Sequence, residues 1–323
     1  MVLIDGNYFA RRFFHSAHAK NEKLEDSLKM FRHLFLYNLI NLKVRFAGKY
    51  GQLVIAKDWS SWRKEVLPSY KGNRKEKNKD PEILEFFKVY EDLASFLMDN
   101  TNIKVLSSIN VEADDIIYVL SKTPGKHLVY SSDKDLIQCL NDDVDVFDFN
   151  NDRFIQKSKD VVAKFMVHHI LIGDNTDNIP NITWNSNYTK EFEKWIKNKY
   201  NIDMSIKILY KFIREESLFF EEYREETKLK PFKGIRMGKK TADKLIEADG
   251  VNELINSNPI IKRNYKINEF LIDMSNIPEP IKETILNLFY NYKIKIPNFN
   301  MLYRYCDLHD LSKVKERINK LIN

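Results

Sequence analysis

The sequence is poor in glycine and proline, with nine residues of each among 323. Average proteins contain about 7% glycine and 5% proline, so this scarcity argues against turn-rich β architectures, collagen-like chains and low-complexity chains. The sequence also has no uninterrupted apolar run near the roughly 20 residues that a membrane-spanning helix needs. We therefore expect a globular, mainly helical protein with no membrane partner.

Cysteine is scarcer still, because Cys139 and Cys306 are the only two. They lie far apart, and no cysteine or histidine stands at the spacing of a structural zinc site, so we interpret both as small core residues. The first residues, MVLIDGNY, lack the basic and apolar stretches of a secretory signal, which predicts a reducing, cytoplasmic location.

Two common phosphate-binding motifs are absent from the sequence. It contains neither G-x-G-x-x-G after a strand nor G-x-x-x-x-G-K-[ST], which argues against dinucleotide and P-loop binding. LIDGNY has no second aspartate two residues after the first, which argues against aspartyl-phosphate chemistry.

Positive charge is concentrated in two segments. The chain has a formal net charge of +6, whereas residues 63–79 (RKEVLPSYKGNRKEKNK) carry +5 and residues 233–244 (KGIRMGKKTADK) carry +4. The rest of the chain is slightly acidic. Local basic segments of this kind indicate contact with nucleic acid more strongly than a mildly positive total does.

Short apolar runs alternate with stretches of helical periodicity in the first half of the chain. The runs at 2–4, 53–56, 103–106, 127–130 and 144–147 predict a parallel α/β sheet. We expect helices at about 26–47 and 82–99, the second with Leu84, Phe87, Leu93 and Phe96 buried. After residue 158 the pattern predicts helices at 159–172, 189–199, 204–223, 239–248, 279–292 and 310–322.

Acidic residues follow four of the five apolar runs. The carboxyl ends of strands in an open α/β sheet form the binding crevice, so these side chains are expected to converge there. The set comprises Asp5, Asp58, Glu112, Asp114, Asp115, Asp133 and Asp135, and a further pair, Asp174 and Asp177, follows the helix expected at 159–172.

So many carboxylates in one crevice would repel one another unless cations neutralise them. A ligand set of oxygens without histidine or thiolate favours Mg²⁺ or Mn²⁺ over Zn²⁺. The alternative is that each acid only caps a helix or begins a turn. Their joint occurrence favours the metal site, whereas we interpret the adjacent His168 and His169 as structural.

Several motifs occur together in a fixed order: LIDGNY, KDWSSWRKEVLPSYKGNRKEK, VEADDIIY, SSDKDL, GDNTDNIP and GIRMGKKTADKL. In this order the sequence resembles the flap endonuclease and 5′ nuclease superfamily, most closely its phage ribonuclease H branch. The resemblance implies a PIN-like, mostly parallel sheet flanked by helices, with a basic helical arch at about 60–98. It places the nuclease domain at 1–180 and a mainly helical DNA-binding region with a helix-hairpin-helix at 181–323.

The resemblance also implies roles for the acids. One metal ion would be held by Asp5, Asp58, Glu112 and Asp114, with Asp115 nearby, and a second by Asp133, Asp135, Asp174 and Asp177. The cofactor would be two Mg²⁺ ions, for which Mn²⁺ can substitute.

Basic residues match the family in the arch and the hairpin. Arg63, Tyr70, Lys71 and Arg74 match the arch, where Lys71 and Arg74 would neutralise the scissile phosphate; the alternative is a solvated basic loop. Gly238, Lys239 and Lys240 match the hairpin, which would bind duplex phosphates. The sequence departs from the family at Arg236, where a hairpin glycine is expected, and in the insertion at 183–233.

We therefore expect a monomeric, structure-specific 5′ nuclease acting as 5′-3′ exonuclease and flap endonuclease in replication and repair. Its substrates would be 5′-flap, nicked or forked DNA and RNA-DNA hybrid, including RNA primers. Its location would be the host cytoplasm if a phage encodes it. Recruitment by a single-strand DNA-binding protein or a sliding clamp stays open. The alternatives are a PIN-like ribonuclease and a non-catalytic protein that binds branched DNA.

Overall fold

The computed structural model describes residues 1–72, 80–156, 158–183, 189–201, 222–223, 225–228, 237–257 and 259–322. The chain divides into two compact units: unit 1 comprises Met1–Ser61, Glu76–Ser158 and Pro278–Asn323, and unit 2 comprises Trp62–Lys75 and Lys159–Ile277. The boundary expected near residue 180 does not coincide with this division, because residues 159–180 belong to unit 2 and the last helices to unit 1. The helix expected at 204–223 lies almost wholly outside the described residues.

Unit 1 is built on a six-stranded sheet with the order β3-β2-β1-β4-β5-β6. The five predicted strands are confirmed and pair in parallel: β1 (Val2–Asp5), β2 (Leu53–Ala56), β3 (Lys104–Leu106), β4 (His127–Tyr130) and β5 (Val144–Asp148). The two-residue β6 (Arg153–Phe154) pairs antiparallel with β5. The sequence did not indicate β6, because both of its residues are exposed and no apolar run marks them.

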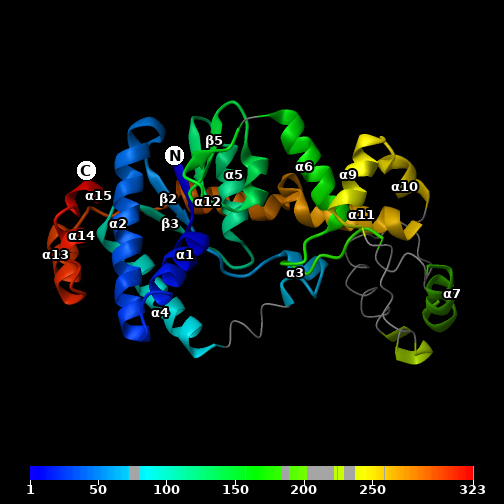
Figure 1. Cartoon of the computed structure of the whole chain (residues 1–323), viewed down its shortest axis with the longest axis horizontal. Helices are drawn as coiled ribbons and strands as arrows, with labels where there is room; N and C mark the ends of the chain where they lie inside the picture. Colours follow the sequence, from blue (N-terminus) through cyan, green and yellow to red (C-terminus); the bar gives the residue numbers. More distant parts are fainter. Residues whose placement is uncertain are drawn as a thin grey trace. The chain divides into compact units, whose positions relative to one another are not determined.

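Helices flank this sheet (Figure 1). The described helices of unit 1 are α1 (Gly6–His18), α2 (Leu24–Tyr50), α4 (Pro81–Asn100), α5 (Ala113–Ser121), the 3₁₀ helix η3 (Lys134–Cys139), α12 (Glu279–Tyr290), α13 (Phe299–Leu308), α14 (Ser312–Lys315) and α15 (Asn319–Ile322). Near the end of the chain, α14 and α15 pack against α2, and α13 packs against α4. The single helix expected at 310–322 is thus two short helices.

The helix expected at 82–99 forms as α4, but its buried face differs from the prediction. Leu84 is 50% exposed, and Phe87 and Phe96 are only partly buried. The buried residues are instead Phe86, Val89, Tyr90, Leu93, Ala94 and Leu97. Apolar residues stand at both 86 and 87, so the sequence fits two helical registers, and packing against α1 and α2 selects one of them: Phe86 stacks on Phe14, with ring centroids 4.4 Å apart.

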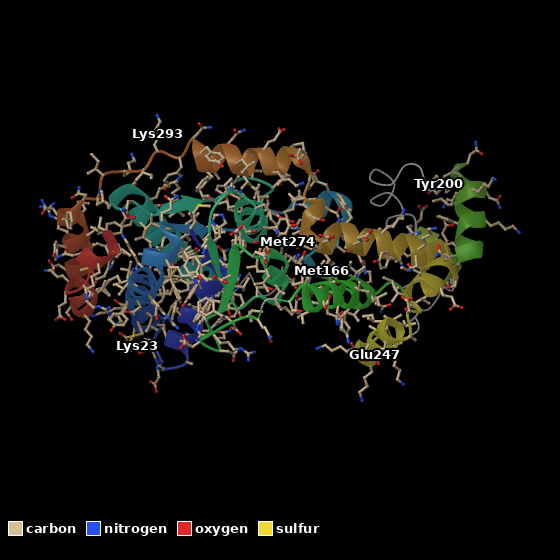
Figure 2. The ribbon with its side chains drawn as sticks, turned by 90° about the horizontal axis from the view of Figure 1, so that it is seen from above. Lys23, Met166, Tyr200, Glu247, Met274 and Lys293 are labelled. Atoms are coloured by element: carbon tan, nitrogen blue, oxygen red, sulfur yellow. The ribbon has the colours of Figure 1, made fainter. Side chains whose placement is uncertain are left out.

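The core of unit 1 is rich in aromatic rings. Phe9 makes edge-to-face contacts with Phe35 and Phe149, with ring centroids 5.1 and 5.9 Å apart. Cys139 and Cys306 are both buried and free, as predicted. Side chains are drawn in Figure 2, where Lys23 marks the connection between α1 and α2 and Lys293 the stretch after α12.

Unit 2 is helical in the part that the structure describes. It contains α3 (Arg63–Val66), α6 (Lys159–Ile172), α7 (Thr189–Tyr200), α9 (Lys239–Glu247), α10 (Val251–Ser257), α11 (Pro259–Ile272) and the 3₁₀ helix η5 (Met274–Asn276). Its core joins Leu171, Ile182, Met237, Ala242 and Ile261. Within the described ranges of both units, no helix is long and apolar enough to cross a membrane.

Candidate metal centre and nucleic-acid interface

Asp5 stands at the carboxyl end of β1 and is 5% exposed. Its Oδ1 accepts a hydrogen bond from the Tyr8 amide at 3.0 Å, which caps α1, and its Oδ2 accepts one from the Ser131 hydroxyl at 3.1 Å. Burial, followed by the neighbouring charge of Asp58, raises the pKa of Asp5 to about 7, with Asp133 contributing further. These side chains therefore lie close enough for their negative charges to oppose one another.

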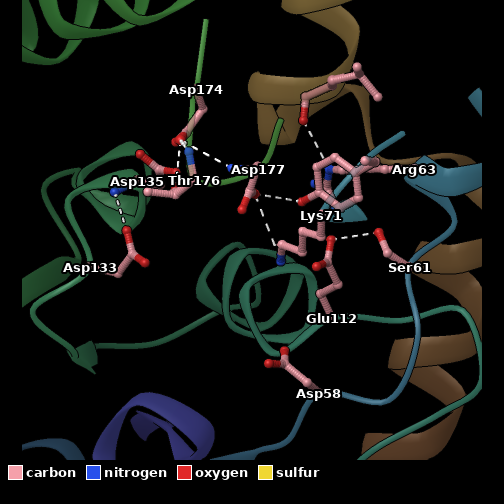
Figure 3. A network of polar contacts seen from close by, with 12 residues as sticks. Asp58, Ser61, Arg63, Lys71, Glu112, Asp133, Asp135, Asp174, Thr176 and Asp177 are labelled. Carbon is pink, nitrogen blue, oxygen red and sulfur yellow. Dashed lines mark hydrogen bonds and ion pairs between the residues drawn. The ribbon is translucent and has the colours of Figure 1, made fainter. Parts of the chain in front are cut away.

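Asp58 and Glu112 come from the ends of β2 and β3. The Asp58 Oδ1 accepts a hydrogen bond from the Ala113 amide at 2.8 Å, and the Glu112 Oε2 accepts one from the Ser61 hydroxyl at 2.6 Å (Figure 3). Glu112 and Asp115 also form a reciprocal capping box at the start of α5. The same acids therefore cap a helix and also lie at the carboxyl edge of the sheet, because the strand ends place them at the start of a helix.

Asp114 and Asp115 differ in burial although they are adjacent. Asp114 is partly buried in the first turn of α5, whereas Asp115 is fully buried and its Oδ2 accepts the Glu112 amide at 3.1 Å. This contact gives Asp115 a structural role at the start of α5. A role for either residue in metal binding stays a prediction.

Ser131 links the first and fourth strand ends. Its hydroxyl donates to Asp5, and its oxygen accepts the Asp133 amide at 3.0 Å. Asp133 in turn accepts the Asp135 amide at 2.9 Å and caps η3. In unit 1 the structure thus brings Asp5, Asp58 and Asp133 together at the carboxyl edge of the sheet, as the strand order predicts.

The remaining acids lie in a tight loop of unit 2. Asp174 and Ile179 exchange two backbone hydrogen bonds of 2.9 and 2.8 Å. Gly173 precedes this loop with φ +68°, and a Cβ there would lie 2.4 Å from the Ile179 carbonyl oxygen, so only glycine fits. The Asn268 amide of α11 braces the loop by donating to the carbonyls of Ile170 and Pro180, at 3.0 and 2.8 Å.

Asp174 is surrounded by hydrogen-bond donors. Its Oδ1 accepts from the Thr176 amide at 2.7 Å and the Thr176 hydroxyl at 2.6 Å, and its Oδ2 lies 3.2 Å from the His169 Nε2. Burial opposes ionisation of Asp174, but the hydrogen bonds from His169 and Thr176 outweigh it and hold the pKa below its ordinary value. His169, predicted to be structural, is 4% exposed and positions Asp174.

Asp177 joins this loop to the segment that follows α3. Its Oδ2 accepts the Tyr70 hydroxyl at 2.8 Å and lies 3.8 Å from the Lys71 Nζ, while its carbonyl accepts the Lys71 amide at 2.8 Å (Figure 3). The Asn178 side chain donates to the Ser69 carbonyl at 2.8 Å. Two of the arch residues are thus held beside one of the predicted metal ligands.

The other two arch residues have different positions. Arg63 is 5% exposed, and its Nε donates to the Leu271 carbonyl at 2.9 Å at the end of α11. This is a structural contact within unit 2, and a direct contact with DNA stays a prediction. Arg74 lies outside the described residues, as do all of residues 73–79 within the arch predicted at about 60–98.

The two halves of the predicted hairpin come together despite the insertion between them. Leu171 and Ile182 before the insertion share one core with Met237 and Ala242 after it. Gly238 caps α9, and its carbonyl accepts the amides of Thr241 and Ala242 at 2.9 and 3.0 Å. Lys239 and Lys240 are exposed in the first turn of α9. Arg236 lies outside the described residues.

Sequence reasoning missed the residues that hold the acids in place. Ser61, Ser131 and Asn268 act through hydrogen bonds between distant segments, and single polar residues carry no periodic signal. The two serines lie within the motifs KDWSSW and SSDKDL, and this position is the one indication that the sequence offered.

A mostly parallel sheet flanked by helices, with carboxylates at the carboxyl ends of its strands, places this chain among α/β proteins. Residues 1–166 match the family described as 5′-3′ exonuclease, N-terminal resolvase-like domain. The chain belongs to this family, and the predicted membership of the 5′ nuclease superfamily is confirmed.

Three relatives show the extent of the similarity. The chain is 26% identical over 196 residues to the 5′-3′ exonuclease of Buchnera aphidicola subsp. Schizaphis graminum, covering 56% of this chain and 65% of that protein. It is 30% identical over 159 residues to the 5′-3′ exonuclease of Aquifex aeolicus, covering 46% and 53%. It is 27% identical over 197 residues to the flap endonuclease of Escherichia phage T5, covering 55% and 64%. The chain thus spans between about half and two thirds of the length of these relatives.

A solved structure of the T5 5′-exonuclease, with divalent metal ions (zinc) bound, has a related fold. It superposes with a TM-score of 0.50 at 19% identity, covering 90% of this chain and 98% of that chain. This likeness supports the predicted fold class, a mostly parallel central sheet flanked by helices.

Proposed function

We propose that this protein is a structure-specific 5′ nuclease that hydrolyses phosphodiester bonds at 5′ flaps, nicks and forks of DNA and in RNA-DNA hybrids. The relatives described as 5′-3′ exonucleases and as a flap endonuclease support this activity. RNA-primer removal in replication and repair is the role that such an activity would serve.

The observation that carries the proposal is the crowding of Asp5, Asp58 and Asp133. Burial and two neighbouring charges raise the pKa of Asp5 to about 7. A fold that gathers like charges in this way needs a positive charge to balance them, and a bound cation supplies it. Carboxylate oxygens are the ligands that Mg²⁺ prefers, with Mn²⁺ as a substitute.

We assign the ligands in two groups. Asp5, Asp58, Glu112 and Asp114 would hold one ion, with Asp115 supporting Glu112. As the family resemblance implies, Asp133, Asp135, Asp174 and Asp177 would hold the second. These acids would hold two divalent cations, which would supply a water-derived nucleophile at neutral pH and charge stabilisation for the leaving oxygen.

The protein's own basic residues would hold the substrate. Lys71, already fixed beside Asp177, and Arg74 would neutralise the scissile phosphate, as positively charged clamps do in phosphoryl transfer. Lys239, Lys240 and the first amides of α9 would bind duplex phosphates and so position the 5′ end without reading its sequence.

The test compares a 5′-labelled flap, a nicked duplex and an RNA-DNA hybrid, each with Mg²⁺ and with EDTA. Wild-type protein should cut in Mg²⁺ and not in EDTA. Asp133→Asn should abolish cleavage but leave DNA binding within a few-fold, because an amide cannot supply the ligand charge. Full cleavage by Asp133→Asn, or wild-type cleavage in EDTA, would refute the metal assignment.

The same assay separates the alternatives. Cleavage of single-stranded RNA but not of flaps would favour a PIN-like ribonuclease. Tight binding to branched DNA without cleavage in any metal would favour a non-catalytic binding protein. Nothing in the described residues favours either alternative over the nuclease, since all nine acids are present.

A further inference from the structure

Helix α4 brings a tyrosine beneath the carboxyl ends of β1 and β2. Tyr90 is 1% exposed. A Cβ added to Gly6 would lie 2.5 Å from the Tyr90 hydroxyl oxygen and 2.7 Å from the Ala56 carbonyl oxygen. Gly6 directly follows Asp5, and Ala56 comes two residues before Asp58. The hydroxyl therefore lies against the backbone from which both predicted ligands extend.

The packing around Tyr90 fixes its ring. The ring stacks on Phe86, with centroids 6.3 Å apart, and contacts Phe35 at 5.9 Å. The Lys57 Nζ lies 5.5 Å from the ring centroid and pairs with the Glu91 carboxylate at 2.5 Å. These neighbours hold the ring in one orientation, with its hydroxyl at the strand ends.

The Tyr90 hydroxyl makes no hydrogen bond to any residue that the structure describes. Buried hydroxyl groups nearly always have a partner, and an unsatisfied one is unfavourable for folding. An apolar phenylalanine would fill the same space without that disadvantage. The position of this hydroxyl therefore indicates that it has a hydrogen-bond partner in another state of the protein.

The charges that face Tyr90 define that partner. Burial first, and then the negative charges of Asp5, Glu91 and Asp58, raise the pKa of Tyr90 well above its ordinary value. The phenol therefore keeps its proton, and a neutral phenol beside carboxylates can donate a hydrogen bond to them. Such a donor stabilises the ionised form of a carboxylate, which is the form that binds a metal ion.

We propose that Tyr90 is a positioning residue of the metal centre, whose hydroxyl donates a hydrogen bond to the Asp5–Asp58 carboxylate pair when a divalent cation is bound there. This inference rests on the proposed function. It adds a residue outside the acidic motifs, carried by α4, to the group that sets the affinity for the cation. Removing a group that orients metal ligands typically weakens metal affinity about 10- to 100-fold.

The experiment measures Mn²⁺ binding to the full chain by electron paramagnetic resonance, and thermal unfolding in EDTA and in Mn²⁺. The variant is Tyr90→Phe, and the matched control is Tyr50→Phe, which removes another well-buried hydroxyl that donates to Asp145. Tyr90→Phe should bind Mn²⁺ about tenfold more weakly. It should unfold in EDTA at the wild-type temperature or above, and Mn²⁺ should stabilise it less. Tyr50→Phe should be less stable and keep wild-type affinity.

Each other outcome is decisive. Wild-type Mn²⁺ affinity in Tyr90→Phe overturns the proposal, as does a clear loss of stability or of folding in EDTA, because the hydroxyl would then support the fold. Wild-type protein that binds no Mn²⁺ overturns the proposed function itself. The two failures are therefore distinguishable.

Discussion

Asp5 in unit 1 and Asp174 in unit 2 are both nearly buried, at 5% and 9% exposed, yet their pKa values shift in opposite directions. Burial and the charge of Asp58 raise the pKa of Asp5 to about 7, and its two hydrogen bonds offset only part of this. At Asp174, burial acts in the same direction, but the donors His169 and Thr176 outweigh it. Burial raises the pKa of both carboxyl groups, so the balance between repelling carboxylates and hydrogen-bond donors sets the direction of the net shift.

The comparison distinguishes two ways to build an acidic site. The edge of the sheet in unit 1 gathers carboxylates from several strands and relies on a cation to balance them. The loop of unit 2 balances its own acids with donors and with Lys71. The predictions below test this difference, from the largest expected effect to the smallest.

Removing the positive charge beside Asp177 should have the largest effect. If Lys71 contacts the scissile phosphate, Lys71→Ala should lower single-turnover cleavage of a flap about 100-fold or more, roughly 2.7 kcal/mol. Lys64→Ala, an exposed lysine of α3, is the control and should have little effect. Equal, small reductions for both variants at saturating enzyme would remove Lys71 from the catalytic residues.

Neutralising the two aspartates should change stability in opposite directions. In EDTA at pH 7.5, Asp5→Asn should stabilise the protein, because it removes a charge that the fold disfavours. Asp174→Asn should destabilise it by about 1.5–3 kcal/mol, because it removes hydrogen bonds to a charged acceptor. Urea denaturation measures both, and shifts of the same sign would contradict the comparison.

The same difference predicts a pH dependence for the metal-free protein. The pKa of Asp5 rises from 3.8 to about 7 on folding, so between these values the folded chain binds more protons than the unfolded chain. The free energy of unfolding should therefore fall as the pH rises through this window, by up to about 1.4 kcal/mol per pH unit, and Asp5→Asn should remove this fall. Asp174 should increase the free energy of unfolding above about pH 4, and this stabilisation should disappear at lower pH, because the pKa of Asp174 is depressed on folding.

The brace of the unit 2 loop should have a smaller effect. Asn268→Ala removes a donor from two buried carbonyls, at a cost of about 1–3 kcal/mol, and should also slow cleavage because these carbonyls flank Asp174 and Asp177. Asn264→Ala, which removes a donor from the Ile182 carbonyl, is the matched control. Equal cleavage rates for the two variants would show that the brace does not position the acids.

The hairpin should show the smallest effect. Lys239→Ala combined with Lys240→Ala should weaken duplex binding and flatten its salt dependence, by about 0.9 in log-log slope for each phosphate that the protein no longer neutralises. Binding titrations between roughly 50 and 200 mM salt would measure this slope. An unchanged slope would mean that these lysines do not bind DNA.

Much of unit 1 could be predicted from sequence because its signals are local. Apolar runs indicated the five parallel strands, and acids directly after them indicated the carboxyl edge. Helix α1 was not predicted, although its buried residues Phe9, Ala10, Phe14 and Ala17 stand at helical spacing. The buried face of α4 was predicted wrongly, because the apolar residues at 86 and 87 fit two helical registers. For the same reason the burial of Tyr90 was not predicted.

Other features depend on contacts between distant segments and left no local pattern. In the sequence, helix capping and metal binding were alternative interpretations of the acids. In the structure, Glu112 and Asp133 each cap a helix while lying at the carboxyl edge of the sheet, so the two roles are compatible. The brace from Asn268 joins α11 to a loop about 90 residues earlier. The division into units was equally hidden, because unit 1 resumes after Pro278.

This late return of the chain has a consequence for biosynthesis. The Lys43 Nζ of α2 donates to the Leu321 carbonyl at 2.7 Å, and the Arg317 guanidinium lies 4.8 Å from the Tyr37 ring centroid. The ribosome must therefore translate unit 2 before the last surface of α2 is covered, a delay on the order of 10 s at usual elongation rates. A chain stopped after Ile277 would leave this surface of α2 open to solvent, and we expect it to aggregate. The nascent protein cannot complete the core of unit 1 until the residues that follow unit 2 have been translated.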